Sequence, residues 1–245
     1  MQAEKQWFEN WFDTKYYHIL YQSRNDDEAN FFMSNLVTHL NVKPNAEVLD
    51  LACGKGRHSI FLNHKGLNVT GLDLSNESIA FAKDFENESL HFDVHDMRKV
   101  YPKKFDFVFN LFTSFGYFEN DAENQATVNA MKNMLKTDGI LVIDFLNAFK
   151  TVQNLVAKEE KELDGITFKI ERNVVNGFIV KTINFKDKGK SFSYQERVKA
   201  LTLNDFKNFF ESAGLQLKEI FGNYKLETFN AETSGRLIMV LEQSK

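Results

Sequence analysis

The 245-residue sequence contains one cysteine, two prolines and no apolar run of the length that a membrane span requires. A single cysteine excludes an internal disulfide, which fits a reducing compartment. A spanning helix needs about 20 mostly apolar residues, so none is predicted. The first residues have neither the basic start nor the apolar segment of a secretory signal. We therefore expect a globular protein of the cytoplasm, without a membrane partner.

The sequence also lacks an excess of positive charge, because its formal net charge is −4. Such a balance argues against a protein that grips phosphate backbones, and nucleic acid is a disfavoured partner. Residues 150–199 carry eleven Lys or Arg against seven Asp or Glu. That modest bias is equally typical of a solvated surface, so modification of RNA stays a weaker alternative. The oligomeric state is not indicated by any of these features.

Hydrophobic periodicity predicts an α/β fold. Residues 4–40 have helical spacing of apolar side chains, and from residue 47 strand and helix patterns alternate. This alternation favours a mostly parallel, Rossmann-like doubly wound sheet. The predicted strands are 47–51, 68–73, 90–94, 105–111 and 139–145, and the predicted helices between them are 57–65, 76–86 and 123–135. Ser75 is expected to cap the second of these helices.

The pattern changes after residue 149. Three stretches alternate apolar with polar residues. The two segments between them contain Asn176-Gly177 and Asp187 to Lys190, which are typical of hairpin turns. They predict a three-stranded antiparallel insertion at 166–172, 178–185 and 191–198. A helix at 203–213 follows, and strands at 215–224 and 236–242 are expected to pair antiparallel at the sheet edge. The sheet should therefore have seven strands, the last of them antiparallel.

These elements suggest three parts of the chain. Residues 1–46 form an N-terminal helical cap, and residues 47–159 and 200–245 form the main α/β domain. Residues 160–199 form the antiparallel insertion, which we expect to cover the carboxyl edge of the main sheet.

The first strand of the main domain ends in a glycine turn, Asp50 to Gly56. Gly54 and Gly56 allow positive φ and a close approach of ligand to backbone. A dinucleotide fingerprint needs a third glycine or alanine at the position where this sequence has Ser59. Asp50 would also repel a pyrophosphate, whereas a cofactor with an ammonium and a sulfonium would be attracted. S-adenosylmethionine carries both groups, and an NAD(P)-dependent oxidoreductase is the alternative.

Further motifs follow in a fixed order. Asp73 ends the second strand, 23 residues after Asp50, close to the roughly 20-residue spacing of ribose-binding acids. The remaining motifs are Asp96-Met97 after the third strand, the fourth strand at 105–110, and the turn into the fifth strand at 135–142.

Taken in this order, the motifs resemble class I S-adenosylmethionine-dependent methyltransferases over residues 47–147. The flanking regions resemble, more loosely, bacterial small-molecule enzymes of this class with a helical cap and a β insertion. The resemblance implies that Asp73 holds the ribose hydroxyls, that Leu74 lies against adenine, and that residues of the cap, with Tyr17 among the candidates, approach the methionine carboxylate. The residues expected to bind S-adenosylmethionine, and to release S-adenosylhomocysteine, are Tyr21, Arg24, Asp50, Ala52, Cys53, Gly54, Gly56, Asp73, Leu74, Asp96, Met97 and Asn110.

The acceptor is expected near the loop that follows the fourth strand. After Asn110 the chain reads Leu111-Phe112-Thr113 and not Pro-Pro-aromatic, so amino methyltransferases of nucleic acids are disfavoured. The only cysteine lies in the glycine turn, which disfavours a cytosine C5 enzyme. A small hydroxyl or amine acceptor remains, methylated by in-line displacement without an obligatory base. The residues expected to line its site are Phe112, Tyr117, Tyr194, Glu196, Arg197 and Tyr224.

One further interpretation of the sequence stays open, and another is set aside. A non-catalytic module could keep the cofactor pocket, if the loop after the fourth strand filled the acceptor space. His91, Asp93, His95 and Asp96 resemble a metal cluster in composition. Strand alternation places the first two on one face while the others lie beyond the strand, so no metal is expected.

Overall fold

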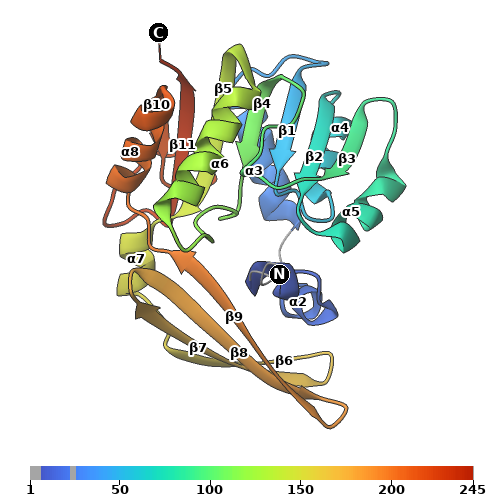
Figure 1. The fold of residues 1–245 in the computed structure, drawn as a ribbon, viewed down its shortest axis with the longest axis vertical. Helices are drawn as coiled ribbons and strands as arrows, with labels where there is room; N and C mark the ends of the chain where they lie inside the picture. The colour runs from blue at the N-terminus through green and yellow to red at the C-terminus, as the bar shows by residue number, and fades with distance from the viewer. Residues whose placement is uncertain (1–6, 23–25, 245) are drawn as a thin grey trace.

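A seven-stranded sheet forms the centre of the molecule (Figure 1). The computed structural model describes residues 7–22 and 26–244. Strand order across the sheet is β10-β11-β5-β4-β1-β2-β3. The strands are β1 Glu47–Leu51, β2 Asn68–Asp73, β3 Leu90–Val94, β4 Phe105–Asn110, β5 Leu135–Leu146, β10 Leu215–Phe221 and β11 Arg236–Gln243.

The pairing of these strands confirms the predicted doubly wound sheet. β1 pairs in parallel with β2 on one side and with β4 on the other. β11 is antiparallel to both β5 and β10. Because the chain runs outward from β1 to β3 and then returns to β4, strand order reverses between β1 and β4. Ligands of open α/β sheets bind in the crevice at such a reversal.

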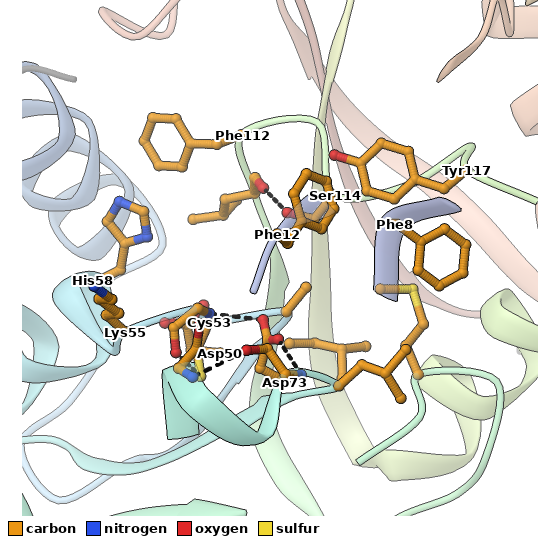
Figure 2. Close-up of a pocket in the computed structure, with 18 of the residues that line it drawn as sticks. Phe8, Phe12, Asp50, Cys53, Lys55, His58, Asp73, Phe112, Ser114 and Tyr117 are labelled. Atoms are coloured by element: carbon orange, nitrogen blue, oxygen red, sulfur yellow. Dashed lines mark hydrogen bonds between the residues drawn. The ribbon is translucent and has the colours of Figure 1, made fainter. Parts of the chain in front are cut away.

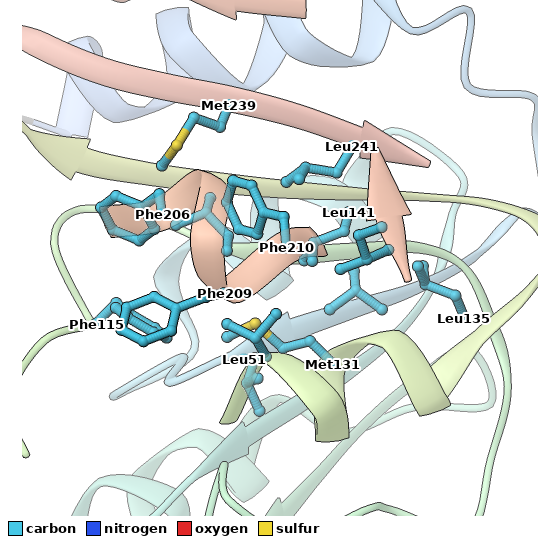
Figure 3. Packing of buried hydrophobic residues seen from close by; sticks show 14 of the residues in the cluster. Leu51, Phe115, Met131, Leu135, Leu141, Phe206, Phe209, Phe210, Met239 and Leu241 are labelled. Atoms are coloured by element: carbon cyan, nitrogen blue, oxygen red, sulfur yellow. The ribbon is translucent and has the colours of Figure 1, made fainter. Parts of the chain in front are cut away.

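Helices cover both faces of the sheet. On one face, α6 (Asp121–Met134) and α8 (Leu203–Ala213) bury apolar side chains against the strands, as Figure 3 shows. On the other face lie α3 (Asp26–His39), α4 (Arg57–His64) and α5 (Asn76–Ala82), the last continued by the short helix η1 (Lys83–Phe85). Nine phenylalanines are buried in these two clusters, and their rings account for much of the core.

Several helix and strand ends follow from local sequence. Ser75 caps α5, as predicted, because its hydroxyl accepts a hydrogen bond from the Ser78 amide. Gly214 ends α8 in the left-handed conformation. β5 begins at Leu135, four residues before the predicted start, since Leu135 already pairs with Phe105 across a register irregularity. One helix, α7 (Ala148–Gln153), was not predicted.

The insertion contains the three predicted strands and a fourth before them. The strands are β6 Lys158–Leu163, β7 Ile166–Val175, β8 Phe178–Asp187 and β9 Lys190–Lys199, paired antiparallel in this order. β6 reads Lys-Glu-Glu-Lys-Glu-Leu and none of its residues is buried, so it lacks the apolar alternation by which the others were predicted. Charged edge strands of this kind deter pairing with other chains.

The N-terminal helical region is divided between two places. α1 (Trp7–Trp11) and α2 (Lys15–Leu20) pack against the insertion, where Trp11, Tyr16 and Leu20 share a buried cluster with residues of β7 and β8. α3 instead packs under the main sheet. Figure 1 shows the insertion at one end of the main sheet, with α2 between the two.

Candidate active site

A cavity of about 640 Å³ opens where β1, β2 and β4 end. Ligand pockets of proteins commonly measure roughly 300–1,000 Å³. Its floor comes from the loops after these strands, and its cover comes from α1, α2 and β9. Figure 2 shows His58 and Phe112 on one side of it, Phe8, Phe12 and Tyr117 on the other, and Asp50, Cys53 and Asp73 below.

The glycine turn after β1 has the positive φ angles that its sequence predicts. Ala52, Gly54 and Gly56 have φ of 66°, 55° and 80°. A Cβ on Gly54 would meet no atom within 4 Å, whereas one on Gly56 would lie 2.6 Å from the Phe92 ring. Gly54 therefore leaves room in the cavity, and Gly56 permits close packing behind it. Ala52, Cys53 and Gly54 line the cavity, and Gly56 does not.

Two buried acids flank this turn. Asp73 accepts hydrogen bonds from the amides of Gly54 at 2.8 Å and Ser75 at 2.9 Å. Burial raises the pKa of Asp73. Asp50 is 3% exposed and accepts a 2.6 Å hydrogen bond from the Ser59 hydroxyl. Burial raises the pKa of Asp50 to about 6. Both carboxyls border the cavity, where a cationic ligand would stabilise their charged forms.

Three more of the residues expected to bind the cofactor reach the cavity. Leu74, Asp96 and Met97 line it. Asp96 is held by Arg98, whose Nε donates at 2.9 Å and whose terminal nitrogen donates at 2.7 Å. Burial raises the pKa of Asp96, but the hydrogen bonds from Arg98 outweigh burial and leave the pKa below its usual value. Arg98 also binds Glu123, so the carboxylate of Asp96 is fixed in orientation.

Two of the predicted cofactor residues have roles in the wall of the site. Asn110 is fully buried and does not line the cavity; its amide donates to the Leu51 carbonyl at 3.0 Å. This bond ties the end of β4 to the end of β1. Cys53 borders the cavity but is 6% exposed, and burial raises the pKa of its thiol well above the usual value. A buried thiol of this kind is unreactive, so Cys53 serves packing and not nucleophilic chemistry.

The cover of the cavity is tied to the insertion by Glu196 of β9. Its carboxylate accepts from the Tyr21 hydroxyl at 2.6 and 2.7 Å and from the Trp11 indole at 2.7 Å. The Lys181 ammonium contacts both Tyr21 and Glu196. Because the single O–H of Tyr21 is donated to Glu196, it is not directed to a cofactor carboxylate in this conformation. Tyr17 and Tyr21 line the cavity, and Arg24 lies outside the described residues.

The structure separates the residues predicted for the acceptor into two groups. Phe112, Tyr117, Glu196 and Tyr224 line the cavity. Tyr194 shares the face of Glu196 but lies further along β9, where its ring packs on Trp11 at 4.6 Å. Arg197 points to the opposite face of β9 by strand alternation, and binds Glu119 at 3.0 Å. Neither residue lines the cavity.

Some lining residues were not predicted from sequence. The largest are aromatic rings of α1 and the residue after it, which give no motif and read as helix packing. Arg236 is another, since it begins β11 far from any motif. Unpredicted residues that line the cavity include Trp7, Phe8, Phe12, Lys55 and Arg236.

The histidine and aspartate group near β3 is dispersed. Asp93 accepts from the Tyr101 hydroxyl at 2.6 Å, and the His95 ring contacts the Lys99 carbonyl at 2.9 Å. Within residues 7–22 and 26–244, no group of three or more His, Cys, Asp or Glu is placed to hold a metal ion. The helices of the same ranges include none that is long and apolar enough to cross a membrane.

Comparison with known proteins assigns the chain to a family. A family described as a methyltransferase domain matches residues 42–214. The chain belongs to this methyltransferase family. The match begins before β1 and runs through the whole insertion to the end of α8.

Individual relatives agree with this assignment. The chain is 27% identical to a putative methyltransferase, YqeM, of Bacillus subtilis, over 81% of this chain and 84% of that protein. It is 27% identical to a dTDP-3-amino-3,4,6-trideoxy-alpha-D-glucopyranose N,N-dimethyltransferase of Streptomyces venezuelae, over 72% and 78% of the two chains. The fold is similar to an S-adenosylmethionine-dependent methyltransferase of Clostridium acetobutylicum, with a TM-score of 0.79, 18% identity, and 94% and 96% of the chains covered.

Membership of this family confirms the predicted enzyme class and its cofactor. The methyltransferase is S-adenosylmethionine-dependent, and the NAD(P)-dependent alternative is set aside. The glycine turn, Asp73 and a cavity of suitable size are features that suit this cofactor.

Proposed function

We propose that this methyltransferase transfers a methyl group from S-adenosylmethionine to an amine of a small molecule. One observation carries the proposal. The glycine turn and Asp73 line the same cavity as the aromatic side chains of Phe112 and Tyr117, which lie in the loop after β4. Donor and acceptor could therefore lie in one enclosed space, as an in-line displacement requires.

We assign the donor to the side of the cavity formed by β1, β2 and β3. Asp73 would hold the ribose, since its carboxylate borders the cavity and is already oriented by two backbone amides. Leu74 and Met97 would enclose the adenine, beside the fixed carboxylate of Asp96. Asp50 would stabilise the positive charge of the cofactor from below. When bound, the sulfonium supplies the activated methyl group.

An amine suits the acceptor side better than a hydroxyl does. A neutral amine attacks without prior loss of a proton, whereas attack by a hydroxyl gains more from a base that takes its proton. Two phenols of the wall are poorly suited to that task. Burial raises the pKa of Tyr224, so it keeps its proton, and the Tyr117 hydroxyl donates to the Thr113 carbonyl at 2.6 Å. The amino-sugar N,N-dimethyltransferase of Streptomyces venezuelae supports an amine acceptor by analogy.

The insertion would help to enclose the acceptor. Glu196 and Val198 of β9 line the cavity, while the other face of the strand carries Arg197 and its partner Glu119. Sequestering the site from water would protect the sulfonium and hold the amine close to the methyl group.

The donor assignment can be tested by isothermal titration of the full chain with S-adenosylmethionine. Asp73→Asn keeps the size of the side chain but removes its charge, so we expect binding to weaken by about a hundredfold. Asp84→Asn, an exposed acid of η1 outside the cavity, is the matched control and should bind as wild type does. Wild-type affinity in Asp73→Asn would rule out this donor site.

The acceptor assignment needs a labelling screen. Wild-type protein would be incubated with radiolabelled S-adenosylmethionine and a panel of amino sugars, amino acids and alkyl amines, each matched to the corresponding hydroxyl compound. We expect label in amine products, and transfer confined to the hydroxyl series would contradict the proposal.

A further inference from the structure

The loop after β4 has an unusual backbone where it borders the cavity. Phe112 and Thr113 both have left-handed conformations, with φ of 56° and 62°. Residues with a Cβ rarely take this conformation, and two in succession persist only where the surroundings hold them. Strain of this kind gathers at functional sites, which makes the contacts of this turn informative.

All polar atoms of Thr113 are bound. Its amide donates to the Asp144 carbonyl at 3.0 Å, its hydroxyl accepts from Arg236 at 2.9 Å, and its carbonyl accepts from the Tyr117 hydroxyl at 2.6 Å. The Phe112 amide donates to the Asp144 carboxylate at 2.8 Å. The turn is thus fixed by Asp144 and Arg236, from β5 and β11.

Asp144 and Arg236 form an ion pair between neighbouring strands. Nε of Arg236 donates to Oδ1 of Asp144 at 2.8 Å, and Asp144 is fully buried. The Tyr224 hydroxyl lies 3.4 Å from the other carboxylate oxygen, and the guanidinium lies over the Tyr224 ring at 5.6 Å. Arg236 therefore contacts the carboxylate, the turn and a lining ring at once. Its planar fork permits this, whereas a lysine would offer one ammonium.

The Phe112–Thr113 turn also positions several aromatic side chains. The Phe112 ring stacks on His58, with centroids 4.5 Å apart and planes 11° from parallel. It also contacts Phe32 at 5.8 Å and Tyr224 at 5.5 Å. A shift of Phe112 would therefore be felt by His58 and Tyr224, which both line the cavity.

We propose that Arg236, paired with Asp144, is a positioning residue that fixes the Phe112–Thr113 turn and so sets the ring wall against which the acceptor docks. What docks there rests on the proposed function, but the arrangement of the wall does not. Arg236 acts through Thr113 and Phe112, on the side of the cavity opposite the adenine. Its replacement should therefore disturb the acceptor wall while leaving donor binding intact.

The experiment compares three variants of the full chain saturated with S-adenosylhomocysteine. Arg236→Lys keeps the charge but loses the fork, and Thr113→Val removes only the hydroxyl that Arg236 binds. Arg197→Lys is the matched control, an arginine paired with Glu119 away from the cavity. The readout is the NMR signal of the His58 ring, identified among six histidines by its loss in His58→Asn.

Because His58 lies flat on Phe112, its ring protons should resonate upfield in wild type and in Arg197→Lys. We expect this displacement to be largely lost in Arg236→Lys and partly lost in Thr113→Val. Affinity for S-adenosylhomocysteine should stay within about threefold of wild type, because the contacts of Arg236 are to Asp144, Thr113 and Tyr224 and not to the glycine turn or Asp73. An unchanged His58 signal in both variants would overturn the proposal, and so would a parallel loss of cofactor affinity, which indicates a general structural role.

A kinetic arm separates this proposal from the proposed function. With any amine that wild type methylates, Arg236→Lys should lower kcat/KM for the amine by about ten- to a hundredfold, since small displacements of a docking wall are costly. If no amine is methylated, the amine assignment fails, while the His58 signals still decide the role of Arg236. Full activity in Arg236→Lys toward such an amine would contradict the role.

Discussion

The two sides of the cavity are built in different ways. The side that we assign to the donor depends on a short stretch of chain, in which Asp73 accepts hydrogen bonds from the backbone amides of the glycine turn and of Ser75. The acceptor side depends on residues distant in sequence, because Thr113, Asp144 and Arg236 come from three separate elements. Local motifs can encode a common cofactor, whereas the acceptor wall is assembled by tertiary contacts that can vary without altering the donor site.

The sharpest way to break the donor side is to add a methyl group to Gly56. A Cβ there would lie 2.6 Å from the buried Phe92 ring at a φ of 80°, so Gly56→Ala is expected to lower the free energy of unfolding by about 2–4 kcal/mol. Binding of S-adenosylmethionine should be lost with the turn. Urea unfolding and calorimetric titration measure the two effects.

Gly54→Ala is the matched control for this substitution. Gly54 also has positive φ, but a Cβ there meets no atom within 4 Å. The cost should be limited to backbone strain of about 1 kcal/mol. Equal destabilisation by the two substitutions would show that the contact with Phe92 is not what makes Gly56 necessary.

The contrast between the two sides also explains what the sequence could predict. Asp50, Asp73 and Asp96 lie at or just beyond the ends of consecutive strands, so the carboxyl edge of a parallel sheet brings them together wherever that fold forms. Arg236 and Thr113 are 123 positions apart, and no spacing rule connects them. β6 was missed for a related reason, since an exposed edge strand needs no apolar residues to be paired.

The residues of β9 show what strand alternation predicts correctly and what it does not. Alternation correctly divides Glu196 and Val198 from Arg197, but it does not reveal where along the strand the cavity ends. Tyr194 has the right face and the wrong position, because α1 covers that part of the insertion and Trp11 packs on its ring. The path of a helix over a sheet depends on tertiary packing, which a single sequence does not specify.

Acidity offers a milder way to weaken the donor side. The pKa of Asp50 is raised to about 6 by burial, so the carboxyl becomes neutral as pH falls below that value. Its attraction for the cationic cofactor is present above pH 6 and is lost below it. Affinity for S-adenosylmethionine should fall by up to about tenfold between pH 7 and pH 5.

Asp50→Asn provides the control for this pH effect. The amide cannot ionise, so the part of the pH dependence that comes from Asp50 should vanish in titrations of the variant. S-adenosylhomocysteine, which lacks the sulfonium charge, should show a weaker dependence in wild type. A slope that is identical in Asp50→Asn and wild type would assign the effect to another group, such as Asp73, whose pKa is also raised by burial.

The smallest expected effect concerns the cover, where donor and acceptor sides meet. Glu196 accepts from Tyr21 and Trp11, and Glu196→Gln removes the charge that strengthens these bonds. A loss of about 1 kcal/mol from these contacts corresponds to roughly fivefold faster release of S-adenosylmethionine, measured by stopped-flow tryptophan fluorescence. Glu119→Gln, on the outer side of β9, should leave release unchanged. If both variants release the cofactor at the wild-type rate, the contacts of Glu196 serve only to dock α1 and α2 on the insertion. They would then contribute to neither the donor side nor the acceptor side of the cavity.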